Sequence, residues 1–101
     1  MIITDEIKSV IVGTPFLSLV TIGADGDPHP IITGKGEPVG DTIVFGIYKM
    51  EATRKNLASN PKAWVVCATL EGGPKGYRLS GTAAAADKNV IFTAKSAEAM
   101  L

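Results

Sequence analysis

Residues 16–34 read FLSLVTIGADGDPHPIITG, and this stretch decides the fold. Two runs that contain several β-branched residues, 16–23 and 28–34, flank the tetrapeptide ADGD at 24–27. Asp-Gly between such runs is typical of a β-hairpin, because glycine readily adopts the positive φ that a tight turn needs. Both faces of the first run are largely apolar, which indicates a strand with a core on one side and a second cover on the other. We therefore expect this hairpin to begin an antiparallel β domain.

The rest of the chain continues the pattern of short strands. Turn signals recur at roughly 8–12-residue spacing, which favours a small antiparallel barrel over a parallel α/β sheet. The further expected strands are 42–47, 62–70, 77–85 and 89–94. Gly81 is expected to mark a bulge or a sharp bend. Residues 34–41, which are rich in glycine, are expected to form a loop.

Two short helices are expected beside these strands. Thr4 can cap a first helix, whose acidic first turn is followed by apolar residues at helical spacing. A second run of helix formers, 51–59, stops at Asn60–Pro61. With 101 residues, one hydrophobic core is the expectation. The sequence thus predicts a mainly β, small six-stranded antiparallel barrel with short flanking helices, in a single domain over residues 1–101.

The charge pattern and the composition disfavour several binding partners and cellular locations. Ten basic and ten acidic residues are scattered along the chain, so no patch predicts binding to nucleic acid or to a membrane surface. The longest apolar run, around residues 63–70, is too short to span a bilayer. The single cysteine and the acidic N-terminal segment favour a cytoplasmic location.

The usual catalytic patterns are missing from the sequence. One histidine and one cysteine cannot build a metal site of the usual spacing within one chain. No glycine-rich nucleotide loop opens a helix. His29 stands between two prolines at the entry to a strand, which does not favour a hydrolase triad. We therefore predict no catalytic residue and no metal ligand.

The chemically informative segment is FGIYKMEATRKNL at residues 45–57, where a strand passes into a helix. Gly46 would let a ligand approach the end of the strand closely. No side chain at 48–50 can cap the first helical amides, so these amides and the helix dipole favour an external anion. Hydroxyl and basic groups that could complete a phosphate site are those of Lys49, Thr53, Arg54 and Lys55. In the alternative interpretation, water satisfies the amides and the charges form a solvated helix face.

The order of these segments resembles a known family. The hairpin, the helix that ends in N-L-x-x-N-P at 56–61 and the stretch G-Y-R-L-S-G-T-A at 76–83 are similar to the pyridoxamine 5'-phosphate oxidase-like split-barrel superfamily, in particular to its small bacterial FMN-binding proteins. The resemblance covers nearly the whole chain. It implies a split barrel that forms a homodimer, with FMN held at the subunit interface.

The resemblance also implies a function and a set of site residues. The function is that of an FMN-binding electron carrier or small oxidoreductase, served by a redox partner protein or a small-molecule donor. The phosphate would lie at Met50 and Thr53, with Lys49, Arg54 or Lys55 as the positive partner. The ring would lie against Thr33, Gly34, Phe45, Gly46 and Ile47.

Departures from the family pattern at Ala52, Ile32 and Gly34, and the absence of a required catalytic side chain, keep a second function open. Ala52 stands where relatives often place a lysine, so the identity of the positive partner is open. The alternative is a dimeric split-barrel module, without catalysis of its own, for another phosphorylated or redox ligand such as pyridoxal phosphate, haem or a deazaflavin.

Three side chains of the later strands carry separate expectations. Trp64 is interpreted as an inward strand residue of the core or of a dimer interface, with stacking on a flavin as the alternative. Arg78 is expected to reach a carboxylate or a partner chain. Cys67 is expected to be a buried structural thiol.

Overall fold

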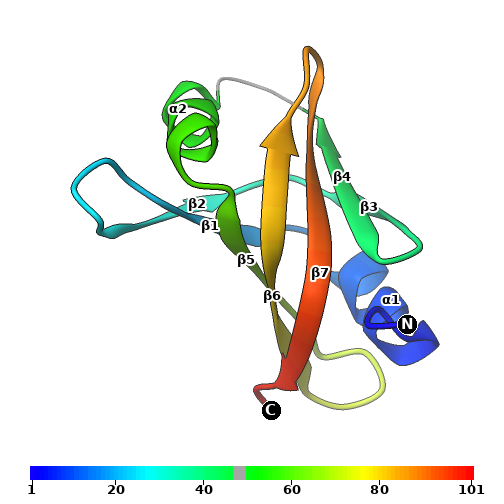
Figure 1. The fold of residues 1–101 in the computed structure, drawn as a ribbon. Coiled ribbons are helices and arrows are strands. Elements are labelled where there is room, and N and C mark those ends of the chain that lie inside the picture. Colours follow the sequence, from blue (N-terminus) through cyan, green and yellow to red (C-terminus); the bar gives the residue numbers. More distant parts are fainter. Residues whose placement is uncertain (47–49) are drawn as a thin grey trace.

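The computed structural model describes residues 1–46 and 50–101. Within them the chain forms two helices and one antiparallel sheet with the strand order β2-β1-β5-β6-β7-β4-β3 (Figure 1). The elements are α1 Asp5–Gly13, β1 Ser18–Ile22, β2 Pro28–Ile32, β3 Gly36–Val39, β4 Thr42–Gly46, α2 Glu51–Ser59, β5 Lys62–Thr69, β6 Lys75–Ala85 and β7 Asn89–Ala99. The long β6–β7 ladder lies between the β1–β2 hairpin and the β3–β4 hairpin, with α1 and α2 on opposite sides of the view (Figure 1).

The mainly β prediction is confirmed, but the strand count of six is wrong. The described residues form seven strands, because part of the expected loop 34–41 is strand β3. Gly40 has φ 59°, which allows a two-residue turn and pairs Val39 with Thr42 of β4. The sequence hid this strand because glycine and proline are uncommon in strand interiors.

Strand β3 also shows how far the sheet curls. A Cβ added to Gly36 would lie 2.5 Å from Ile43 Cγ2, 2.9 Å from Phe45 Cε1 and 3.0 Å from Leu17 Cδ1. Leu17 immediately precedes β1, which lies near the opposite edge of the sheet. The β3 edge therefore folds back towards the β1 side, and the inner face encloses a core.

Alternate residues of the strands fill this core. β1 and β5 alternate between buried and partly exposed side chains, as a strand with one face on a core should. α1 adds its apolar stripe to one side of the sheet. The fully buried large side chains are Val10, Ile11, Leu17, Leu19, Ile43, Phe45, Val65, Leu79, Val90 and Phe92. No helix within the described ranges is long and apolar enough to cross a membrane.

The first helix is fixed at its N-terminus as the sequence predicts. Thr4 Oγ1 accepts a hydrogen bond from the amide of Ile7 at 3.3 Å. Asp41 Oδ1 accepts from the amides of Ile2 and Ile3, both at 2.9 Å. The turn between β3 and β4 therefore anchors the segment that leads into α1.

Both edge strands carry prolines whose nitrogens point away from the sheet. Gly23 N donates to Asp27 O at 2.9 Å, so these two residues form a hydrogen-bonded pair. Along an antiparallel ladder, hydrogen-bonded residue pairs alternate with pairs that exchange no hydrogen bond. Pro28 and Pro30 of β2 therefore occupy non-bonded pairs with β1, and their nitrogens face the open edge. Pro38 takes the equivalent place in β3, one residue from its two-residue turn. Since proline has no N–H, neither edge is suited to pair with a further strand.

The predicted irregularity at Gly81 is confirmed. The register of β6 against β7 shifts between Ser80 and Gly81. β7 continues past this point to pair Ala99 with Tyr77, so it runs beyond the expected end at residue 94. The extra residues escaped the sequence pattern because they are polar or small and all exposed.

A side chain at Gly81 should destabilise the fold strongly. A Cβ there would overlap the carbonyl oxygen of Thr93, which is backbone and cannot move aside cheaply. We expect Gly81→Ala to lower the free energy of unfolding by about 3 kcal/mol, measured by urea denaturation. Gly34→Ala is the matched control, because a Cβ at Gly34 meets no heavy atom within 4 Å. Equal unfolding midpoints for the two variants would contradict this account of the bulge.

Candidate functional site

The residues expected to line a flavin ring divide between the two faces of the sheet. Thr33 and Phe45 point inward, with exposed fractions of 5% and 1%. Thr33 Oγ1 donates to the carbonyl of Leu17 at 3.1 Å, which holds it in the core. Gly34 and Gly46 are exposed, and a Cβ at either would meet nothing within 4 Å. Of the predicted ring contacts, only these two glycines border open space; Ile47 lies outside the described residues.

The residues expected to hold a phosphate lie at the first turn of α2, except Lys49, which is also outside the described residues. Met50 occupies the N-cap position, and its side chain makes no capping hydrogen bond to the helix. Thr53 is 1% exposed and points into the core, so its side chain is not at the surface. Arg54 is partly buried and Lys55 is exposed. Backbone amides and Arg54 are therefore the groups that this turn offers to an anion.

One hollow on the outer face of the sheet includes a predicted residue, Gly46. This hollow, which we call the β4 groove, has a volume of about 550 Å³. It lies over β3, β4 and the start of β7. Its walls include Lys35, Glu37, Val44, Gly46, Lys88 and Asn89. Two lysines against one glutamate give these described walls a net positive charge, and an apolar floor lies between them.

The β4 groove and the first turn of α2 are close neighbours. Three residues join Gly46 to Met50, so the two Cα atoms are at most about 14 Å apart. Arg54 Nη1 donates to the carbonyl of Asp87 at 3.5 Å. Asp87 lies in the β6–β7 turn. It directly precedes Lys88 of that turn and Asn89, the first residue of β7, and both of these line the groove. An elongated ligand with one anionic end could therefore reach from the groove to the uncapped helix.

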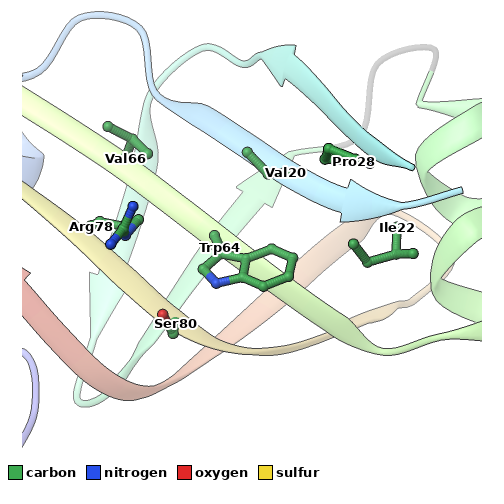
Figure 2. A pocket seen from close by; sticks show the side chains of 7 residues that line it. All are labelled: Val20, Ile22, Pro28, Trp64, Val66, Arg78 and Ser80. Atoms are coloured by element: carbon green, nitrogen blue, oxygen red, sulfur yellow. The ribbon is translucent and has the colours of Figure 1, made fainter. Parts of the chain in front are cut away.

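A second hollow of about 550 Å³ lies on the outer face of β1, β5 and β6, with Pro28 of β2 at its rim. Figure 2 shows the side chains that line this Trp64 face: Val20, Ile22, Pro28, Trp64, Val66, Arg78 and Ser80. The expectation that Trp64 points inward is wrong. Ala63, Val65 and Cys67 of β5 are buried, so alternation turns Trp64 outward. The buried Cys67 confirms the expected structural thiol, and its burial raises the pKa of the thiol.

Side chains in the first half of β6 contact carboxylates, Arg78 on the Trp64 face and Lys75 and Tyr77 on the opposite face of the strand. Arg78 contacts Glu98 of β7 in an ion pair, which confirms that it reaches a carboxylate. Tyr77 donates its hydroxyl hydrogen bond to Glu6 of α1, and Lys75 lies 3.6 Å from the same carboxylate. The hydrogen bond raises the pKa of the Tyr77 phenol and, together with Lys75, lowers the pKa of Glu6. The contacts of Tyr77 and Lys75 with Glu6 tie α1 to β6 on the core side of that strand. On the Trp64 face, Lys62 Nζ lies 5.9 Å from the centre of the Trp64 ring.

Sequence reasoning missed Lys35, Lys88 and Asn89. Their local sequences are those of ordinary turns and carry no motif. Lys35 lies near Gly46 through the β3–β4 hairpin, whereas Lys88 and Asn89 do so because β4 pairs with β7, which places Gly46 directly opposite Asn89. A pairing between strands so far apart in the sequence cannot be derived from local pattern.

Comparisons with known proteins agree with this fold. The model of the pyridoxamine 5'-phosphate oxidase family matches residues 3–99. HupZ of Group A Streptococcus has 21% sequence identity and a TM-score of 0.82, over 99% of this chain and 94% of that one. An FMN-binding protein from Syntrophomonas wolfei has 14% identity and a TM-score of 0.78, over 93% and 83% of the two chains.

A heme binding protein from Mycobacterium smegmatis shares the same fold over a smaller part of its length. It has 14% identity and a TM-score of 0.71, over 92% of this chain and 51% of that chain. A search of curated protein sequences finds no match. The structural likenesses show the fold, and the family model covers nearly every residue. The chain therefore belongs to the pyridoxamine 5'-phosphate oxidase family.

Proposed function

We propose that this protein binds FMN and acts as an electron carrier or a small oxidoreductase. The observation that carries the proposal is the uncapped first turn of α2 beside the positively charged β4 groove, which is open above Gly46. The phosphate would bind at the helix and the isoalloxazine ring in the groove. The likeness to an FMN-binding protein of the same fold supports this choice of ligand.

At the helix, the phosphate would be held mainly by backbone. The first amides of an α-helix have no partner within it, and the helix dipole favours an anion there. Arg54 adds a guanidinium between α2 and the β6–β7 turn, and Lys55 adds a second cation nearby. Thr53 contributes its amide rather than its buried hydroxyl. Glu51 opposes the anion, so Arg54 is the side chain on which binding should depend most.

At the groove, the ring would lie over glycine and aliphatic side chains. Gly46 removes the Cβ that would keep a planar ring away from β4. Once bound, the isoalloxazine supplies the redox chemistry, while the protein supplies binding, orientation and charge. Lys35 and Lys88 would place positive charge near the ring, which favours its acceptance of electrons. A redox partner protein or a small-molecule donor would deliver them.

A second copy of the chain would cover the Trp64 face. Val66 is 36% exposed, and Phe16 and Ile32 beside it are 68% and 72% exposed. Water contact of so many apolar groups on one face is unfavourable and marks an interaction surface. The prolines at both edges disfavour strand addition, so face-to-face packing is the association mode that the sheet allows. The homodimer expected from the resemblance would use this face, which shares no lining residue with the β4 groove. The expected position of FMN at the subunit interface stays a prediction.

The first test is cofactor binding and its dependence on Arg54. The purified protein should show flavin absorbance or take up added FMN with a rise in melting temperature. Arg54→Gln should weaken FMN binding about tenfold, because one charge-assisted hydrogen bond to the phosphate is lost. Riboflavin, which lacks the phosphate, should bind both proteins equally.

Lys95→Gln, on the exposed far part of β7, is the charge-matched control and should leave the FMN affinity unchanged. Mass spectrometry of the molecules released on denaturation identifies the native ligand. Recovery of haem, a deazaflavin or pyridoxal phosphate in place of FMN would reject the proposed cofactor and favour the binding-module alternative.

The second test is the oligomeric state. Trp64→Glu places a charge in the centre of the proposed interface, and desolvating it should convert the dimer to a monomer in sedimentation at micromolar concentration. Val39→Glu is the control, because Val39 is a 55% exposed apolar residue on the edge strand β3, away from the Trp64 face. A monomeric wild-type protein, or a dimer that Trp64→Glu leaves intact, would exclude this interface.

A further inference from the structure

The wall of the β4 groove contains a polar group without a partner. Asn89 Oδ1 is shielded from solvent and forms no hydrogen bond within the described part of the chain. A shielded carbonyl oxygen without a donor costs free energy, so such groups are uncommon in folded proteins. Asn89 as a whole is only partly buried and lines the groove. Its carboxamide is therefore in a position to gain a partner from a ligand in that groove.

The space that the carboxamide needs is next to it. Asn89 lies directly opposite Gly46 in the β4–β7 register, so the two residues share the outer face of the sheet. A Cβ at Gly46 would meet no heavy atom within 4 Å. Rotation of the Asn89 side chain about its Cα–Cβ bond would bring the amide group over this open area. Both its oxygen and its NH₂ group would then face whatever occupies the groove.

A primary carboxamide combines one acceptor with adjacent donors. Its complement is a planar edge that offers an N–H beside a carbonyl oxygen, because the two groups then form a pair of parallel hydrogen bonds. The pyrimidine part of an isoalloxazine has this edge: a cyclic imide whose N–H lies between two carbonyls. Deazaflavins carry the same imide, whereas haem and pyridoxal phosphate do not.

We propose that Asn89 is the specificity-determining residue that recognises the cyclic-imide edge of the ligand ring in the β4 groove, an inference that rests on the FMN-binding function proposed above. Asn89 Oδ1 accepts from the imide N–H, and its NH₂ group donates to a neighbouring ring carbonyl. Lys88, the preceding residue on the same wall, lies near this electron-rich edge and favours it electrostatically. The ring thus enters the groove with its pyrimidine end towards the β6–β7 turn.

The test compares FMN with an FMN analogue methylated at the imide nitrogen. The wild-type protein should bind FMN at least about tenfold more tightly than the analogue, because methylation removes the donor and leaves Asn89 Oδ1 unpaired. In Asn89→Ala this ratio should fall to about one, through a loss of FMN affinity. Ser96→Ala, an exposed position farther along β7, is the control and should keep the wild-type ratio.

The outcomes separate this inference from the proposed function. A wild-type protein that binds neither FMN nor 5-deaza-FMN overturns the proposed function and the inference with it. Tight FMN binding with equal affinity for the methylated analogue overturns the inference alone, and this holds even if Asn89→Ala does not fold. An unchanged ratio in a folded Asn89→Ala protein also overturns it. Preference of the wild type for both imide-bearing ligands over their methylated forms, lost in Asn89→Ala, supports it.

Discussion

The antiparallel pairing of β4 with β7 is the interaction on which the rest of this structure depends. Ile43 lies opposite Phe92 and Phe45 opposite Val90, so the ladder completes the apolar interior. β3 joins the sheet through β4 alone. The turn between these two strands anchors the segment before α1. The same ladder ends with Gly46 opposite Asn89, the first residue of β7. Core, sheet edge and candidate site are thus consequences of one long-range pairing.

Alternation along β4 explains why the core and the site can occupy successive residues. Phe45 faces inward and fills the interior, whereas Gly46, one residue later, faces the groove. The strand is therefore fixed by an interaction on the face opposite the groove. Thr33 and Gly34 repeat this arrangement after β2, with the buried hydroxyl bonded to a backbone carbonyl and the glycine exposed. Such a scaffold can hold two approachable backbone positions without relying on a bound ligand for its own stability.

Local chemistry made much of the fold predictable. The Asp-Gly turn, the Thr4 cap and the Gly81 bulge each follow from the conformation that one residue type favours, and each is present. Strand β3 was not predictable in the same way, because its Gly36 is chosen for close approach to Phe45 rather than for strand propensity. The outward direction of Trp64 could not be predicted either. Both faces of β5 carry apolar residues, so the sequence does not show which face is turned inward.

Only the part of the candidate site that residues 45–57 form could be predicted from the sequence. The absence of a capping side chain before α2 and the exposure of Gly46 follow from residues 45–57, and both are present in the described residues. The opposite wall comes from the β6–β7 turn, which nothing in that segment specifies. Phe45 and Thr33 stay predicted ring contacts through their backbone alone, because both side chains are turned into the core.

Charge separates the roles of the two outer hollows. On the Trp64 face, Arg78 is neutralised by Glu98, and the remaining lining is mostly aliphatic or aromatic. Such a surface gains free energy from excluding water, and the cation beside it, Lys62, lies with its Nζ 5.9 Å from the centre of the Trp64 ring. In the β4 groove, two lysines exceed one glutamate, and an arginine bonds to the adjoining turn. Because cations near a helix N-terminus attract anions, the groove suits the proposed phosphorylated ligand, whereas the mostly apolar Trp64 face suits the proposed second chain.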